Sequence, residues 1–218
     1  TSTMVFIVRK GNPKQIKDWP DIAAPGIQMI IPHPKNTGNG RNTYLSAWAW
    51  ALKQPGGNDK SAQAFVGKLL KNAPLFAAGG RDATTTFMQR KMGDVLITFE
   101  SEAEMIAKEF GKGEFEVIYP SLTMQTEFPV ALVEKVVDKK GTRVQAKAYL
   151  DYLWSKDGQE NAAQNYLRPR DPELQKKYAS SFPAVKTFTV DEVFGGPGKA
   201  FVTHFKDGGS FDQLYSAK

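Results

Sequence analysis

The sequence predicts an α/β fold with a largely parallel sheet. Short apolar runs, such as Met4–Val8 and Ile27–Ile31, alternate with longer segments in which apolar residues recur every three or four positions. Continuous apolar runs are typical of strands buried on both faces, and the three-to-four spacing is typical of amphipathic helices. Strands that alternate with helices favour parallel pairing within one sheet.

The expected elements follow in a simple order. Predicted strands cover Met4–Val8, Ile27–Ile31, Asp94–Phe99, Phe115–Tyr119 and Phe128–Val133. Predicted helices cover Leu45–Leu52, Ala62–Asn72, a threonine-rich segment up to Phe87, Glu100–Lys108, Thr142–Trp154 and Asp157–Tyr166, with Asp157 as an N-cap, and short helices follow to the end. The strand Phe128–Val133 is expected to pair with Met4–Val8, as two connections between domains. Because the chain opens within a predicted core strand, we expect it to be a piece of a longer protein.

The composition excludes several classes of function. The chain has 218 residues, of which 41% are apolar and 24% charged, the proportions of a folded protein. Its net charge of +6 is diffuse, and the basic pairs Lys139-Lys140 and Lys176-Lys177 have no interleaved aromatic residues, so we expect no nucleic-acid partner. The absence of cysteine excludes disulfides and thiolate metal sites.

The stretch Thr37-Gly-Asn-Gly40 lies between a predicted strand and a predicted helix. Its small residues leave backbone N–H groups uncovered at the start of the helix, where the first-turn donors have no partner inside the helix. The helix dipole adds partial positive charge there, so the loop suits a small anion. The alternative interpretation is an ordinary strand-to-helix connection with Thr37 as N-cap.

A second glycine loop of similar chemistry follows. In Ala77-Ala-Gly-Gly-Arg81, two glycines and an arginine again precede a predicted helix that is rich in threonine. Two such loops in one domain can face a single ligand from two sides. This repetition strengthens the hypothesis of an anion site.

Catalytic and metal-binding motifs are not evident. His33 and His204 stand far apart without ligand spacing, and His204 is expected to pack in the core. The run Gly195–Lys199 lacks the Ser/Thr of a phosphate loop, because Ala200 occupies that position. Glu100 and Glu104 share a helix face, either as an acid/base pair or as ordinary first-turn acids. We expect a protein that is not an enzyme and has no metal or cofactor.

Several segments together carry a resemblance to a known family. They are Phe6–Pro13, Pro32–Lys35 with Thr37, Gly38 and Arg41, Gly79–Arg81, Gly93–Ile97, Tyr166–Asp171 and Asp191–Gly196. With these segments, the chain resembles the periplasmic sulfate- and thiosulfate-binding proteins of ABC transporters. The resemblance implies a type II periplasmic-binding-protein fold that binds a dehydrated oxyanion through backbone amides at helix N-termini.

The resemblance also implies the positions of the site. It places Thr37, Gly38 and Asn39 on the first binding loop and Gly80 on the second, with Arg41 and Arg81 as supporting charges beside them. Phe99 falls where sulfate binders of the family have a tryptophan whose indole N–H donates to the anion. Phe99 has no such donor. The combination of Asn39 and Phe99 is more similar to the thiosulfate-binding branch.

The family begins with a further stretch that this chain lacks. The resemblance therefore implies one complete anion-binding domain over residues 4–130, including the crossover strands, and the C-terminal part of its partner domain over residues 131–218. Implied partners are sulfate or thiosulfate, the membrane subunits of an ABC transporter, and a segment or chain that completes the second domain. The implied location is the periplasm. The alternative is the effector-binding domain of a transcription regulator, which would require an N-terminal helix-turn-helix.

Overall fold

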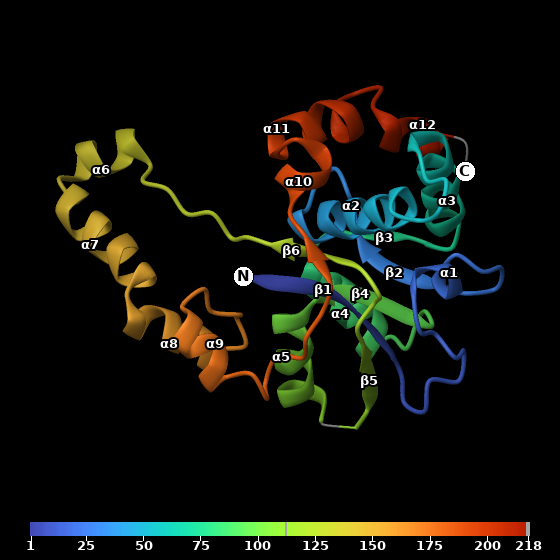
Figure 1. Ribbon diagram of the computed structural model, residues 1–218, viewed down its shortest axis with the longest axis horizontal. Coiled ribbons are helices and arrows are strands. Elements are labelled where there is room, and N and C mark those ends of the chain that lie inside the picture. Colours follow the sequence, from blue (N-terminus) through green and yellow to red (C-terminus); the bar gives the residue numbers. More distant parts are fainter. Residues whose placement is uncertain (112, 217–218) are drawn as a thin grey trace. The chain divides into compact units, whose positions relative to one another are not determined.

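The computed structural model describes residues 1–111 and 113–216, whose chain path is drawn in Figure 1. Seven strands form one sheet in the order β3-β2-β4-β1-β6-β7, with β5 also paired to β1. The strands are β1 (Ser2–Arg9), β2 (Met29–Pro32), β3 (Phe76–Ala77), β4 (Val95–Phe99), β5 (Phe115–Ile118), β6 (Thr123–Thr126) and β7 (Thr187–Phe188).

The chain divides into two compact units. The first, which we call the sheet unit, comprises residues 3–126 and 185–218, and the second, the helical unit, comprises residues 1–2 and 127–184. Helices of the sheet unit are α1 (Trp19–Ile22), α2 (Gly38–Leu52), α3 (Asp59–Lys71), α4 (Gly80–Met88), α5 (Glu100–Phe110), α10 (Val190–Phe194), α11 (Pro197–Ala200), the π-helix η1 (Phe201–Phe205) and α12 (Ser210–Ser216). Helices of the helical unit are α6 (Glu134–Lys140), α7 (Arg143–Trp154), α8 (Lys156–Gln164) and α9 (Pro172–Lys177).

The predicted α/β class is confirmed, but the sheet is mixed. Strand β2 lies parallel to both β3 and β4, and β6 lies parallel to β7. Strand β1 runs antiparallel to β4 and to β5. The expectation of a largely parallel sheet therefore holds only for the strands on either side of β1.

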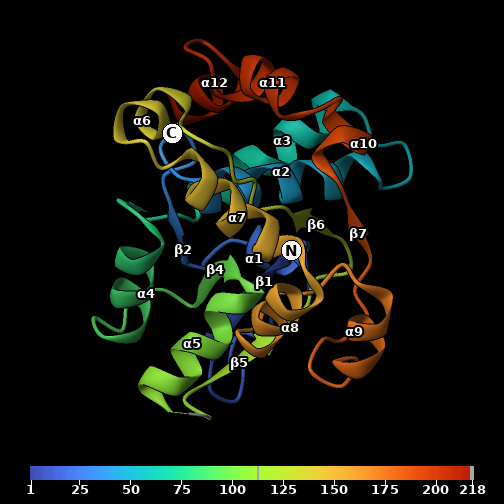
Figure 2. The same ribbon diagram turned by 90° about the vertical axis from the view of Figure 1, so that its left-hand side faces the viewer.

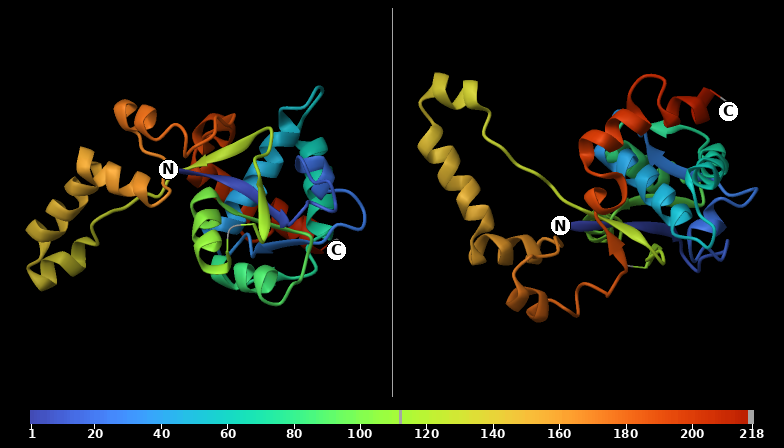
Figure 3. Two further views of the ribbon diagram at one scale, coloured as in Figure 1. Left: turned by 90° about the horizontal axis from the view of Figure 1, so that it is seen from below. Right: turned by 45° about the horizontal axis from the view of Figure 1, so that its top comes forward.

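Strand β1 supplies both hydrophobic cores of the sheet unit, which explains its continuous apolar run. Met4, Phe6 and Val8 face one core, which also contains buried residues of α1, α2 and α3. Val5 and Ile7 face the other, together with residues of α4 and α5. Because successive side chains of a strand point to opposite faces, each face needs apolar residues of its own. The two helical layers are visible on opposite sides of the sheet in Figure 3.

Two local predictions are wrong. Residues 127–133 form no strand, and β6 lies just before them, where the hydroxyl of Thr123 donates to the carbonyl of Met4 at 2.9 Å. Pro129 has no N–H for a strand ladder, so this apolar run suits extended chain better than a paired strand. Asp157 is not the N-cap of α8. Ser155 caps this helix, because its hydroxyl accepts the amide of Gly158 at 3.1 Å.

The compact units differ from the expected division into residues 4–130 and 131–218. Residues 185–218 belong with the sheet unit, where β7 extends the sheet beside β6 and α12 packs against α3. Figure 2 shows α11 and α12 above α2 and α3. His204, Phe205 and Phe211 of this segment are buried, whereas Phe201, Val202 and Tyr215 are exposed.

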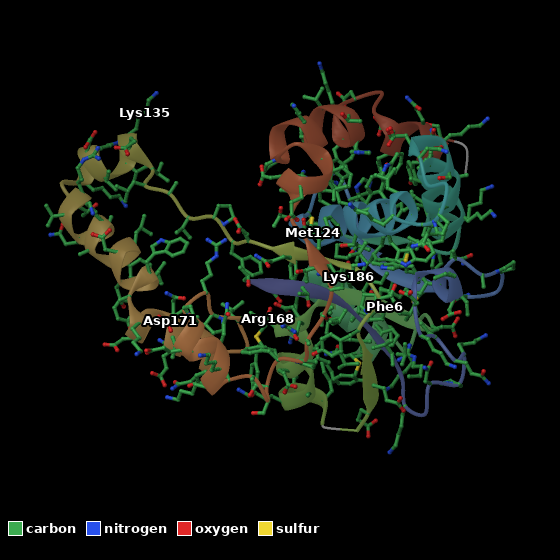
Figure 4. All side chains as sticks on the ribbon, viewed as in Figure 1. Phe6, Met124, Lys135, Arg168, Asp171 and Lys186 are labelled. Atoms are coloured by element: carbon green, nitrogen blue, oxygen red, sulfur yellow. The ribbon has the colours of Figure 1, made fainter. Side chains whose placement is uncertain are left out.

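The helical unit has little apolar burial of its own. Helix α7 contains no buried residue, and Tyr149 and Trp154 are 63% and 60% exposed. Figure 4 shows Lys135 of α6 pointing away from its helix, whereas Phe6 lies among the crowded side chains of the sheet unit. Few apolar contacts therefore hold α7 in place within the helical unit.

Candidate functional site

Three helices begin at one edge of the sheet. Strands β3, β2 and β4 are neighbours and run parallel, and they are followed by α4, α2 and α5 respectively. The carboxyl ends of parallel strands meet at the same edge, where ligands of open α/β sheets bind. Each helix start carries unsatisfied N–H groups and partial positive charge. This edge therefore favours a small anion.

Thr37 caps α2, the helix that follows the first glycine loop. This residue is extended (φ −131°, ψ 145°), and its hydroxyl accepts the amide of Gly40 at 3.0 Å, which confirms it as the N-cap of α2. The same hydroxyl donates to the carbonyl of His33 at 3.0 Å. Among the described residues, no hydrogen bond of the structure uses the amides of Gly38 or Asn39. Those two donors are available to a ligand.

The glycines of this loop serve different purposes. A Cβ on Gly40 would lie 2.2 Å from the carbonyl oxygen of Pro32, so α2 can start this close to the end of β2 only with glycine there. A Cβ on Gly38 would meet nothing within 4 Å. Gly38 therefore has open space where a side chain would lie, and Gly40 permits a close backbone contact.

The second loop lies against the first. Gly79 is the extended N-cap of α4 and has no side chain to cover the amides that follow. A Cβ built on Gly80 would lie 3.7 Å from the side-chain nitrogen of Asn39. The structure thus brings Gly80 together with Asn39, although they are distant in sequence.

Asn39 connects the helix starts through its side chain. It is 5% exposed, and its Nδ2 donates to Oγ1 of Thr98 at 3.0 Å. Thr98 stands near the end of β4, just before α5. Within the described residues, Oδ1 of Asn39 is buried without a hydrogen-bond partner. The carboxamide is therefore a buried polar group with unused capacity at the junction of the three helix starts.

The two arginines point to other partners. Nη2 of Arg41 donates to the carbonyl of Lys35 at 3.1 Å, and its guanidinium lies 5.2 Å from the ring centroid of Phe205. Arg81 forms an ion pair with Glu109 of α5 at 2.6 Å. The contacts of each arginine brace neighbouring elements.

Phe99 brings no polar group to the site. It is the half-buried N-cap residue of α5, makes no side-chain cap hydrogen bond and packs against the core. The next residue, Glu100, is buried and accepts a hydrogen bond from the hydroxyl of Tyr119 at 2.9 Å. Glu100 is thus engaged in a structural contact at the start of the helix.

The two histidines belong to different elements: His33 follows β2, and His204 lies in η1. His204 is 3% exposed, and Oη of Tyr44 lies 3.3 Å from its Nδ1. Burial lowers the pKa of His204 to about 4, and the negative charge of Asp59 opposes this only in part. No group of three or more metal-binding side chains occurs in the part of the chain that the structure describes. Across the same residues, no helix is long and apolar enough to cross a bilayer.

Sequence reasoning missed one cluster at the first loop. Lys35 forms ion pairs with Asp207 and Asp212, both at 2.9 Å. These partners stand more than 170 positions away in the sequence, and no local pattern indicates the pairing.

An open α/β sheet with converging helix starts is typical of proteins that bind a ligand at the edge of the sheet. The sequence model of the bacterial extracellular solute-binding proteins matches residues 1–168, and the chain belongs to this family. Its architecture is the type II solute-binding fold.

Three relatives illustrate the similarity. The thiosulfate-binding protein of Pseudomonas aeruginosa is 60% identical over 99% of this chain, and the sulfate-binding protein of Escherichia coli is 52% identical over 98%. The chain spans 65% of the length of each. The solved structure of a sulfate-binding protein from Mycobacterium tuberculosis superimposes with a TM-score of 0.81 and 29% identity, covering 94% of this chain and 69% of that one.

Proposed function

We propose that this chain belongs to the solute-binding component of an ABC uptake system and that it binds sulfate or thiosulfate. The observation that carries the proposal is the convergence of α2, α4 and α5 at one sheet edge, where Asn39 donates to Thr98 and lies beside Gly80. The uncommitted amides of Gly38 and Asn39 suit a dehydrated oxyanion, because backbone N–H groups at helix starts donate without adding a protonatable group. The names of the relatives support the same ligand class.

In this proposal, Thr37, Gly38 and Asn39 contribute the first loop and Gly80 the second. Arg41 and Arg81 act as supporting charges near these loops rather than as direct ligands, since both side chains are held by other partners. Phe99 forms an apolar wall at the start of α5.

The proposed activity is binding without catalysis. The site offers hydrogen-bond donors but pairs no nucleophile with a base. The proposed setting is the periplasm, with the membrane subunits of the transporter as partners. The alternative of a regulator's effector domain finds no support among these relatives, which carry the names of binding proteins.

A further polypeptide segment, from the same or another chain, is proposed to cover the helical unit. The support for this is the exposure of large apolar residues on α7, which include Val144, Tyr149 and Trp154. Large apolar side chains left exposed in this number favour an interaction.

Calorimetric titration of the natural gene product that contains these residues tests the proposed function. Sulfate, thiosulfate, phosphate and molybdate are titrated separately, and saturable binding of sulfate or thiosulfate is expected. Absence of binding to either would overturn the proposal. Citrate serves as a control for nonspecific attraction of anions by the basic chain.

A further inference from the structure

We propose that α12 positions both glycine loops, and that Lys35 and Asp212 are the positioning residues for the first of them. This inference rests on the proposed function for its effect on anion affinity. Its structural part, that α12 holds the loops in place, is testable without any ligand.

An ion-pair cluster fastens the first loop to α12. Nζ of Lys35 lies 2.9 and 3.0 Å from the two carboxylate oxygens of Asp212 and 2.9 Å from Asp207. The Lys35 and Asp212 side chains are 23% and 31% exposed, whereas that of Asp207 is fully exposed. The amide of Gly208 donates to Asp212 at 2.9 Å and fixes the carboxylate further. Asp212 is therefore the better ordered partner.

The charge of Lys35 is already matched within this cluster. Two carboxylates lie within hydrogen-bond distance of its ammonium group, so the cluster carries net negative charge. Lys35 therefore adds little attraction for an anion at the sheet edge. Its contribution is to the position of the loop.

Hydrogen bonds within residues 33–37 connect Lys35 to the start of α2. The amide of Lys35 donates to Nδ1 of His33 at 3.2 Å, and its carbonyl accepts from Arg41 at 3.1 Å. The amide and hydroxyl of Thr37 both donate to the carbonyl of His33, at 3.1 and 3.0 Å. Thr37 then caps α2, directly before the free amide of Gly38. A displacement of Lys35 therefore displaces the cap.

The same helix reaches the second loop through aromatic contacts. The ring of His33 lies edge-on to Phe211 of α12 and to Phe76 of β3, each at 5.3 Å between centroids. Phe211 also lies 6.0 Å from Phe76 and is 1% exposed. Strand β3 leads directly into the second glycine loop. Helix α12 thus contacts the segments that precede both loops.

Amide donors at fixed positions bind an anion without the cost of ordering the loop at the moment of binding. We expect Asp212→Asn and Lys35→Met each to weaken thiosulfate or sulfate binding roughly five- to tenfold, a factor typical of losing a partly buried charged contact. The double variant is expected to be no weaker than either single variant, because the two residues act as one pair. Exchanging the charges, with Lys35→Asp and Asp212→Lys together, is expected to restore part of the affinity.

Two control variants distinguish the positioning role of the Lys35–Asp212 pair from a general effect of charge on anion affinity. Asp207→Asn removes an equal charge at an exposed position and is expected to have a smaller effect than Asp212→Asn. Lys147→Met breaks a 2.6 Å ion pair on α7 in the helical unit and is expected to leave affinity unchanged.

Hydrogen exchange of the Gly40 and Arg41 amides without anion gives a readout of loop position that does not depend on the ligand, because both amides donate to Thr37. Asp212→Asn is expected to accelerate exchange at these amides, while the core amides of β1 stay protected. If exchange at Gly40 and Arg41 is unchanged in a folded Asp212→Asn variant, the inference is wrong even if the wild-type protein binds the anion. If exchange accelerates but the wild-type protein binds no oxyanion, the proposed function fails and the positioning role stands. Should Asp212→Asn not fold, Lys35→Met removes the same ion pair from the other side and is read by the same exchange measurement.

Discussion

The side-chain amide of Asn39 donates to the hydroxyl of Thr98 at 3.0 Å, and this hydrogen bond joins the first turn of α2 to the end of β4. The same nitrogen also lies beside Gly80, the first residue of α4. One buried side chain therefore lies next to the starts of α2, α4 and α5. The site is therefore built around a neutral polar group that fills the space between its loops.

A negative charge at this junction should be poorly tolerated. We expect Asn39→Asp to weaken oxyanion binding at least tenfold, because a buried carboxylate repels a nearby anion and loses the donor to Thr98. Asn36→Asp changes the net charge equally at an exposed position of the same loop and should have a small effect. Titration of both variants at one ionic strength measures the difference. Equal affinities would place the anion away from Asn39.

Removal of a single backbone donor tests the first loop directly. Gly38 is the first residue of α2, where proline is sterically suited, and Thr37 before it is extended, as a residue preceding proline requires. We expect Gly38→Pro to weaken binding by about 1.5–3 kcal/mol, as for a lost hydrogen bond to a charged group. Gly38→Ala retains the N–H, has open space around its Cβ and should bind nearly normally. The Gly80→Pro variant makes the same test at α4, and unchanged calorimetric affinity in both proline variants would refute the assignment.

Phe99 should influence the choice between the two anions. A sulfur atom needs a hydrogen bond less than an oxygen atom does, so an apolar wall at Phe99 should allow thiosulfate to bind at least as well as sulfate. Phe99→Trp adds an N–H donor, and we expect it to shift the ratio of the two dissociation constants toward sulfate. Phe99→Leu adds no donor and serves as the control. A wild-type protein that already strongly prefers sulfate would contradict this reasoning.

The stability of the sheet unit should depend on pH through His204. Burial lowers the pKa of this imidazole from 6.5 to about 4, so between these values the unfolded chain binds more protons than the folded chain. The free energy of unfolding should therefore fall as pH decreases from about 6.5 to 4, by roughly 3 kcal/mol at most from this group. Tyr44, Trp48 and Asp59 surround the ring, and the neutral variant His204→Phe keeps an aromatic side chain among them.

Urea unfolding at pH 7 and at pH 4.5 gives the measurement. Carboxylates also titrate in this range, so the relevant quantity is the pH effect in the wild-type protein minus the effect in His204→Phe. A difference close to zero would show that the folded protein admits a charged His204.

The helical unit should open more easily than the sheet unit. Helix α7 has no buried residue, so few apolar contacts oppose its local unfolding. We expect amides of residues 143–154 to exchange faster than those of β1 by several orders of magnitude in the isolated 218-residue chain. Equal protection in dilute solution would indicate that α7 is already covered.

The features that could be predicted are those that depend on residues close together in the sequence. The apolar run of β1 indicated burial on both faces, and Thr37 before two glycines indicated the cap of α2. The proximity of Asn39 to Gly80 and the pairing of Lys35 with Asp212 depend on how distant elements pack. No spacing along the chain specifies such contacts. The strand expected at Phe128–Val133 was wrong because apolar composition alone does not distinguish a paired strand from an extended connection.

The position of β7 affects when the sheet unit can complete its fold during synthesis. The sheet unit combines residues 3–126 with residues 185–218, and the whole helical segment 127–184 is synthesised between them. A nascent chain that has reached α5 already contains both glycine loops but not yet Phe211 or Asp212. Native contacts of such high sequence separation form late and slow the folding of a domain. The sheet edge with both glycine loops should therefore reach its final form only after α12 has left the ribosome.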